Sequence, residues 1–219
     1  EISADGGYDA SSIQVLEGLE AVRLRPAMYI GSTGADGLLH ILQEVIDNSI
    51  DEALAGCCSR IRIELAVDGS CMVVDDGRGI PTEVHPSTGT PACEVVMTTL
   101  HAGGKFGTDT YTVSGGLHGV GISVVNALSS WLELEILRDG KRYRQRFAAG
   151  RKTSELEVVG DAEGSGTSIR FMPDPEIFDA DARLDYGRLA RRLRQLAYLV
   201  AGLRIEIDDL RESNSGAEA

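Results

Sequence analysis

Residues 44–52 read Glu44-Val45-Ile46-Asp47-Asn48-Ser49-Ile50-Asp51-Glu52, a mixture of acidic and apolar side chains at helical spacing. At about 100° per residue, Glu44, Asp47, Asn48 and Asp51 share one side of the helix, and the apolar residues share the other. An ordinary solvated acidic face is the alternative, but such faces usually mix charges to gain i,i+4 pairs. Because this stripe contains no Lys or Arg, we expect it to face a cation, and oxygen ligands of this kind suit Mg²⁺.

A second motif follows a short apolar strand and reads Asp75-Asp76-Gly77-Arg78-Gly79-Ile80-Pro81. Glycines at alternate positions allow the backbone to approach a flat ligand closely. A carboxylate at the end of a strand can accept a hydrogen bond from an exocyclic amine. A tight turn with exposed acids is the alternative interpretation of the same residues.

A third motif is rich in glycine and occupies residues 101–106 and 114–121, directly before an apolar helix predicted over 122–128. Backbone N–H groups at the start of a helix attract anions, and glycines leave that backbone uncovered. Lys105 adds a point charge suited to a phosphate. The spacing matches neither a Walker A loop nor the dinucleotide-binding fingerprint. A flexible surface loop is the alternative, but it does not explain why the glycines adjoin a helix start.

Hydrophobic periodicity predicts an α+β fold: a two-layer sandwich in which helices cover one face of a mixed, mostly antiparallel sheet. The expected helices span residues 13–23, 38–54, 91–101, 122–128 and 186–200. The expected strands span residues 61–67, 71–74, 132–138, 141–147, 156–159, 167–172 and 203–207.

Composition restricts the classes of function. The 219 residues carry a formal net charge of −13, which disfavours DNA binding by this domain alone. The four cysteines form no Cys-x-x-Cys pair, so we expect reduced thiols and neither a zinc site nor a disulfide framework. No apolar run approaches the roughly 18 residues that a membrane span requires. We therefore expect a cytoplasmic protein with no membrane partner.

Taken in order, these motifs resemble those of the Bergerat-fold (GHKL) ATPases. The matching residues are Glu44 and Asn48, Asp75-x-Gly77-x-Gly79, Gly116 to Gly121, and Thr167 after Gly164-Ser165-Gly166. That group contains type II topoisomerases, heat-shock chaperones, histidine kinases and mismatch-repair proteins. Within it, residues 23–31, 46–56 and 100–106 resemble the N-terminal ATPase domain of the bacterial DNA gyrase B family, a type IIA topoisomerase family. The resemblance extends over residues 8–208, and the E subunit of topoisomerase IV shares most of these strings.

The resemblance implies a role for each matching residue. Glu44 is expected to be the general base, oriented by His40, and Asn48 the ligand of a Mg²⁺ that bridges the phosphates of ATP. Asp75 is expected to accept the adenine amine, helped by a water that Thr167 holds.

Other positions are expected to surround ATP. Arg78, paired with Glu52, would lie over the adenine, and Pro81 would form a wall. The expected ATP-binding set also includes Asp51, Gly77, Gly79 and Ile80. The residues expected around the triphosphate are Gly104, Lys105, Tyr111, Gly116, Leu117, His118, Gly119, Val120 and Gly121. Arg138 is expected at the outer rim, where aminocoumarin inhibitors of this family dock.

The resemblance also implies a domain organisation and partners. Residues 1–15 would form an arm, 16–210 the ATP-binding domain and 211–219 a tail or linker. Tyr8 and Ile13 of the arm would contact a second copy of the same protein. ATP would close this dimer, and closure would drive DNA strand passage and negative supercoiling. The expected partner is gyrase A, the DNA-cleaving protein, and other domains would bind the DNA. Because the family supplies a lysine to the γ-phosphate from a following domain, we expect the isolated domain to hydrolyse ATP weakly.

Two other classes of function remain as alternatives. A GHKL histidine kinase catalytic domain resembles this fold but lacks the glutamate base that Glu44 provides. A nucleotide-sensing module without hydrolysis would not need the complete set of Glu44, Asn48 and Asp75.

Overall fold

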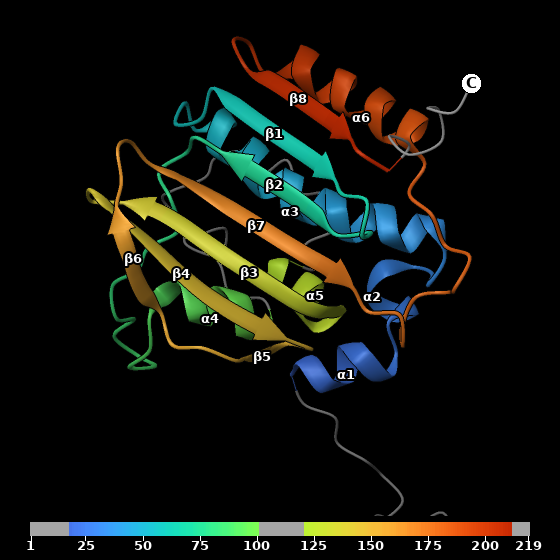
Figure 1. The fold of residues 1–219 in the computed structure, drawn as a ribbon, viewed down its shortest axis with the longest axis horizontal. Helices are drawn as coiled ribbons and strands as arrows, with labels where there is room; N and C mark the ends of the chain where they lie inside the picture. The colour runs from blue at the N-terminus through green and yellow to red at the C-terminus, as the bar shows by residue number, and fades with distance from the viewer. Residues whose placement is uncertain (1–17, 101–120, 212–219) are drawn as a thin grey trace, which may run out of the picture.

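A computed structural model of the chain describes residues 18–100 and 121–211. Within these residues, eight strands form a single sheet (Figure 1). The strands are β1 (Arg60–Leu65), β2 (Cys71–Asp75), β3 (Ser129–Arg138), β4 (Lys141–Ala148), β5 (Arg151–Lys152), β6 (Glu157–Asp161), β7 (Gly166–Pro173) and β8 (Arg204–Asp209).

The sheet has the strand order β5-β4-β3-β7-β2-β1-β8, and β6 pairs with β4 beside this path. Strand β8 runs parallel to β1, whereas the other ladders of the described residues are antiparallel. Strand β7 lies between β2 and β3, where Thr167 is the register partner of Asp75. This topology therefore brings the Asp-Gly loop after β2 next to the start of β7, which is distant in sequence.

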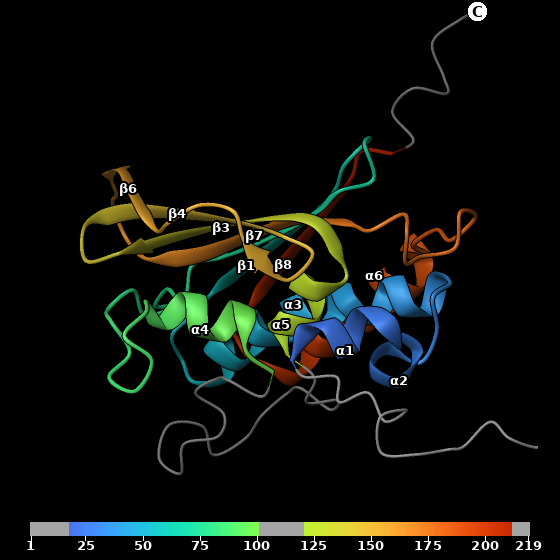
Figure 2. The same ribbon diagram turned by 90° about the horizontal axis from the view of Figure 1, so that it is seen from below.

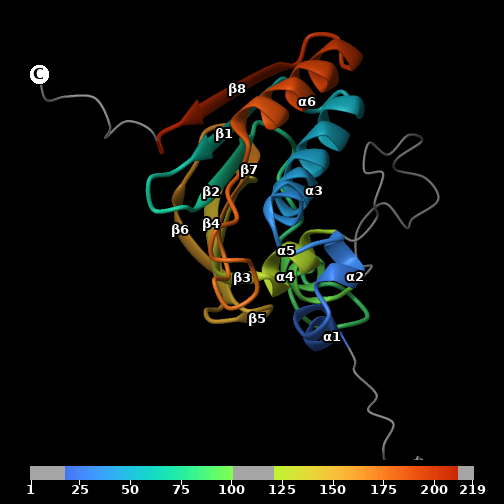
Figure 3. The same ribbon diagram turned by 90° about the vertical axis from the view of Figure 1, so that its right-hand side faces the viewer.

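The helices cover one face of this sheet, as the views in Figures 2 and 3 show. They are α1 (Leu19–Leu24), α2 (Ala27–Ile30), α3 (Ala35–Leu54), α4 (Ala92–Thr98), α5 (Ile122–Ala127) and α6 (Tyr186–Leu199). The predicted α+β class, with two layers and a mostly antiparallel mixed sheet, is confirmed. Two short elements were not expected from the sequence: α2 has four residues and β5 has two.

The hydrophobic core lies between these two layers and is mainly aliphatic. Inward-facing side chains of β1 and β3, such as Ile63 and Leu134, are fully buried and belong to the same core cluster as Ile41 of α3. Helix α3 buries 13 of its 20 residues, so it is a central rather than a surface helix. All four cysteines are free thiols, as predicted. None of the helices in the described ranges is long and apolar enough to cross a membrane.

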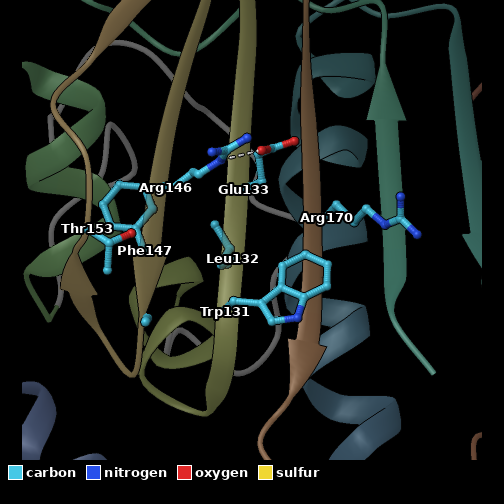
Figure 4. A pocket seen from close by; sticks show the side chains of 8 residues that line it. Trp131, Leu132, Glu133, Arg146, Phe147, Thr153 and Arg170 are labelled. Carbon is cyan, nitrogen blue, oxygen red and sulfur yellow. Dashed lines mark hydrogen bonds and ion pairs between the residues drawn. The ribbon is translucent and has the colours of Figure 1, made fainter. Parts of the chain in front are cut away.

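The sheet also has an open hollow lined by both apolar side chains, such as Trp131 and Phe147, and charged ones, such as Glu133 and Arg146 (Figure 4). Here the Nε of Arg146 on β4 lies 2.7 Å from the Oε2 of Glu133 on β3. Glu133 is also the register partner of Arg170 on β7. Arg146 is exposed and Glu133 partly exposed, and exposed ion pairs of this kind contribute about 0–1 kcal/mol each. The burial of aliphatic side chains between the layers therefore contributes far more to stability than this pair.

One buried polar contact joins the sheet to the helical layer. The side chain of Gln145 on β4 is fully buried, and its Nε2 donates to Oε2 of Glu94 on α4 at 2.8 Å. Glu94 also lies 3.3 Å from Nζ of Lys152 on β5. Replacing Gln145 by an apolar residue would remove this donor and leave Oε2 of the buried Glu94 with only the long, 3.5 Å contact from Nζ of Lys152.

We therefore expect Gln145→Met to lower the free energy of unfolding by about 1–3 kcal/mol, the usual penalty for an unsatisfied buried polar group. Chemical denaturation followed by circular dichroism would measure this difference. The control is Arg142→Met at an exposed position of the same strand, which should change stability by less than about 0.5 kcal/mol. Equal stabilities of the two variants would contradict the prediction.

Candidate functional site

The first cluster forms around the carboxylate of Asp75, the last residue of β2. Its Oδ1 accepts the backbone N–H of Gly77 at 3.0 Å and that of Thr167 at 3.3 Å. Its Oδ2 accepts the hydroxyl of Ser49, from α3, at 2.7 Å. Burial raises the pKa of Asp75 above its ordinary value, although the three hydrogen bonds oppose this rise. A turn with exposed acids therefore does not describe Asp75, whose carboxylate joins α3, the Asp-Gly loop and β7.

Glycines allow the loop to lie close to this carboxylate. A Cβ atom on Gly77 would stand 2.9 Å from Oδ1 of Asp75 and 3.1 Å from Cγ of Glu52. Gly79 has a φ of 75°, and a Cβ there would stand 2.8 Å from the carbonyl oxygen of Leu137 on β3. A Cβ on Gly166 would stand 2.2 Å from the carbonyl oxygen of Asp75. Side chains are thus excluded at these three positions by sterics, because protein atoms pack against the backbone there.

Two arginines flank the loop. Arg78 forms a bidentate pair with Glu52 of α3, with Nε 2.9 Å and Nη2 2.8 Å from the two carboxylate oxygens. Arg138, the last residue of β3, donates from Nη1 to the carbonyl oxygen of Gly79 at 2.9 Å. Bidentate pairs fix geometry as well as charge. Glu52 and Arg138 therefore hold the loop at two neighbouring residues, Arg78 and Gly79. Ile80 is partly buried and Pro81 is exposed.

The second cluster involves Glu44, which lies earlier on α3. Its side chain is buried, with Oε1 3.5 Å from Nε2 of His40 and Oε2 accepting the N–H of Gly121 at 2.9 Å. Gly121, with a φ of 80°, is the residue that precedes α5. A buried carboxylate beside an imidazole, at the end of a glycine-rich segment, is a suitable acceptor for a proton.

The acidic stripe of α3 is not a solvated face. Glu44 and Asp47 are each 5% exposed and Asp51 is 2% exposed. However, the described residues contain no group of three or more His, Cys, Asp or Glu side chains that could hold a metal ion. The interpretation that the stripe as a whole faces one cation is therefore not supported. The reason is its length: Glu44 and Asp51 are separated by about 10 Å along the helix axis, too far for one coordination sphere. Asn48, which is partly exposed, remains the predicted magnesium ligand.

Some predicted positions lie outside the described residues. These are the arm residues Tyr8 and Ile13, and Gly104, Lys105, Tyr111, Gly116, Leu117, His118, Gly119 and Val120 of the glycine-rich segment. Within the described ranges, the sequence reasoning missed Ser49. A buried serine on the apolar side of a helix requires a hydrogen-bond partner, and this signal could have identified it.

Asp76, next to Asp75, has a structural contact instead. Its Oδ1 accepts the N–H groups of Ser59 and Arg60 at 2.7 and 2.8 Å, and its Oδ2 accepts the hydroxyl of Ser59 at 2.6 Å. Burial raises the pKa of Asp76, but the hydrogen bonds from Ser59 and Arg60 outweigh it and lower the pKa to about 2. Asp76 thereby ties the end of β2 to the start of β1, beside the site.

Known proteins are similar to this chain in sequence and in fold. The family model "Histidine kinase-, DNA gyrase B-, and HSP90-like ATPase" matches residues 33–177. The chain is 58% identical over 202 residues to the DNA gyrase B protein of Thermotoga maritima, covering 92% of this chain and 32% of that protein. It is 57% identical to the DNA gyrase B protein of Synechocystis, covering 93% of this chain and 19% of that protein. The chain thus spans about a third or less of the length of these relatives.

A solved structure is also similar. The crystal structure of the 43K ATPase domain of Thermus thermophilus gyrase B, in complex with an aminocoumarin, superposes with a TM-score of 0.79 at 47% sequence identity. The match covers 90% of this chain and 50% of that chain. The agreement therefore includes both sequence and fold.

The contacts of Asp76 generate a prediction about stability and pH. A carboxyl group whose pKa is lower in the folded state stabilises the protein above its unfolded pKa, and this contribution disappears as pH falls through the folded pKa. After discounting for solvent screening of this exposed group, we expect Asp76→Asn to cost about 1 kcal/mol at pH 7. The difference should decrease to roughly half near pH 3.

Urea denaturation of both proteins between pH 7 and pH 3 would measure this dependence. Asp161→Asn, at the exposed end of β6, controls for the removal of one negative charge. A cost that is the same at every pH would show that Asp76 does not act through its ionised carboxylate.

Proposed function

Because the chain belongs to the family of histidine kinase-, DNA gyrase B- and HSP90-like ATPases, we propose that its residues 16–210 form the ATP-binding domain of a DNA gyrase B protein. The observation that carries this proposal is the carboxylate of Asp75. This carboxylate is partly buried and accepts three hydrogen bonds. Packing admits only glycine at Gly77 and Gly166 beside it. Such a site suits a flat base with an exocyclic amine.

Asp75 accepts the adenine amine in this proposal. Gly77 and Gly79 let the ring approach the backbone, and Thr167, the register partner of Asp75, holds a water beside the base. The pair of Arg78 with Glu52 covers one side of the adenine, with Ile80 and Pro81 beside it.

The triphosphate extends from the adenine toward Glu44 and Gly121. The glycine-rich segment with Lys105 and residues 116–121 binds the phosphates, and Tyr111 belongs to the same segment. Along α3, Asn48 lies between Glu44 and Ser49, and Asp51 follows Ser49. Both belong to the proposed ATP-binding set, and Asn48 is the proposed ligand of Mg²⁺. When bound, magnesium neutralises charge on the phosphate oxygens.

Glu44 acts as the general base that accepts a proton from the attacking water, and His40 positions its carboxylate. A positioned base of this kind contributes roughly a hundred- to ten-thousand-fold in rate. The burial of Glu44 and its contacts with His40 and Gly121 support this assignment.

This chain spans about a third or less of the length of its relatives. We propose that the whole protein is the cytoplasmic ATPase component of a type IIA topoisomerase. ATP would close a dimer through the arm that contains Tyr8 and Ile13. Dimer closure would drive strand passage and negative supercoiling with gyrase A, the DNA-cleaving protein, and other domains would bind the DNA. The isolated domain would hydrolyse ATP weakly. The relatives compared are gyrase proteins, which favours gyrase over topoisomerase IV and over a histidine kinase; a supercoiling assay of the complete enzyme separates these.

Arg138 marks the proposed inhibitor rim. The similar Thermus domain was crystallised with an aminocoumarin, and we propose that this chain binds the same inhibitor class. Arg138 donates to the carbonyl of Gly79, so its guanidinium lies beside the loop that follows β2. This contact supports a place for Arg138 at the rim of the proposed site.

We expect Asp75→Asn to weaken the binding of a non-hydrolysable ATP analogue at least tenfold, because an amide cannot supply the same charged acceptor to the adenine amine. Isothermal calorimetry with the full chain would measure this. Asp76→Asn is a matched control that changes the neighbouring carboxylate and should leave the affinity unchanged. Equal affinity of Asp75→Asn and the parent chain would show that the adenine assignment is wrong.

A second variant separates chemistry from binding. In the complete gyrase B protein, Glu44→Gln should retain nucleotide binding, because the amide oxygen can still accept the N–H of Gly121. Its ATP turnover should fall at least a hundredfold, because the amide cannot take a proton. Steady-state hydrolysis and calorimetry would be compared with Glu64→Gln on β1 as a control. Near-parental turnover of Glu44→Gln would remove Glu44 from the mechanism.

A further inference from the structure

Ser49 contacts Asp75 from the central helix of the fold. It lies in α3 and is 2% exposed, and its hydroxyl donates to Oδ2 of Asp75 at 2.7 Å. A serine in the middle of a helix usually donates to a backbone carbonyl in the preceding turn. Here the hydroxyl bridges two elements instead, so Ser49 fixes the Asp75 side chain relative to α3.

The donors around Asp75 leave one acceptor position open. An ionised carboxylate offers about two lone-pair positions on each oxygen. Oδ1 already accepts two N–H groups, from Gly77 and Thr167. Among the described residues, Oδ2 accepts only the hydroxyl of Ser49. One position therefore remains on Oδ2, and its direction depends on where Ser49 holds this atom.

We propose that Ser49 is a positioning residue that determines base specificity, because its hydroxyl directs the open acceptor position of Asp75 Oδ2 toward a 6-amino purine. This inference rests on the proposed function, since it assumes that the base of a nucleotide binds at Asp75. A 6-amino group donates to Oδ2. A 6-oxo purine would place its carbonyl oxygen, another acceptor, opposite Oδ2. Neither oxygen would then have a donor, and binding sites built for a donor strongly disfavour ligands that lack it.

Removing the hydroxyl has a defined consequence. The terminal torsion of an aspartate is broad, so a carboxylate held only through Oδ1 can rotate. In Ser49→Ala, Oδ2 has two open positions and no fixed direction. The preference for 6-amino over 6-oxo purines should therefore decrease, although Asp75 itself is still present.

The test compares three probes: non-hydrolysable analogues of ATP, of inosine triphosphate with a 6-oxo group, and of purine riboside triphosphate with no 6-substituent. Calorimetry on the full chain would give the affinity of each. In Ser49→Ala we expect affinity for the ATP analogue to fall about five- to tenfold. Affinity for the purine riboside analogue should stay within about twofold, so the ratio between these probes decreases. Ser49→Thr, which keeps the hydroxyl, should restore the preference for the ATP analogue.

The outcomes distinguish this proposal from the proposed function. An equal loss of affinity for all three probes in Ser49→Ala would mean that Ser49 only supports the fold, and unchanged ratios would also overturn the proposal. If the parent chain prefers the ATP analogue and Asp75→Asn abolishes that preference, adenine recognition stands whatever Ser49 does. If the parent chain binds none of the probes, the proposed function itself is wrong.

Discussion

The Asp75 carboxylate is the contact on which the geometry of the site depends. It is the last residue of a central strand, and its hydrogen bonds reach the helix α3, the loop at Gly77 and the start of β7. A partly desolvated carboxylate is unfavourable unless donors satisfy it. Two of the donors, Ser49 and Thr167, come from segments far from Asp75 in the chain, so the carboxylate is fully satisfied only when both layers are assembled. The same interaction therefore completes the fold and prepares an acceptor for a ligand.

Close backbone approach is the second constraint, and it follows from the first. The donors can surround Asp75 only if the loop and β7 come within contact distance of β2. At Gly77 and Gly166 a Cβ atom would overlap the carboxylate or carbonyl oxygen of Asp75. At Gly79 it would overlap the carbonyl of Leu137, and the positive φ there also favours glycine. These glycines are thus required by packing in the folded protein, because protein atoms fill the space that a Cβ atom would occupy.

Much of the fold could be predicted from sequence because its main elements have clear periodicity. The amphipathic pattern of α3 and the Asp139-Gly140 turn between β3 and β4 predicted those elements. Helix α2 and strand β5 were missed because a few residues carry no periodic signal. The parallel pairing of β8 with β1 depends on how α6 returns the chain, which the residues of β8 do not encode.

The site was predicted less completely for a related reason. Periodicity places residues on sides of a helix but does not state what packs there, so Asp47 and Asp51 were expected to face a cation although they are buried. Ser49, on the other side, contacts a residue 26 positions away.

Helix α3 connects the two clusters. Glu44 and Ser49 are separated by about 7.5 Å of helical rise, so one rigid element sets the distance between the proposed base and the hydroxyl that holds Asp75. The far side of the Glu44 cluster is also anchored. Arg23 donates to the carbonyl of Ala127 at the end of α5 and pairs with the buried Asp174 at 2.8 Å. Because α5 is held at its end by Arg23 and at its start by the contact of Gly121 with Glu44, the backbone N–H of Gly121 keeps a fixed position relative to α3. The spacing of the site is therefore determined by packed helices and by the contacts of Arg23 and Glu44, and it does not depend on the loops.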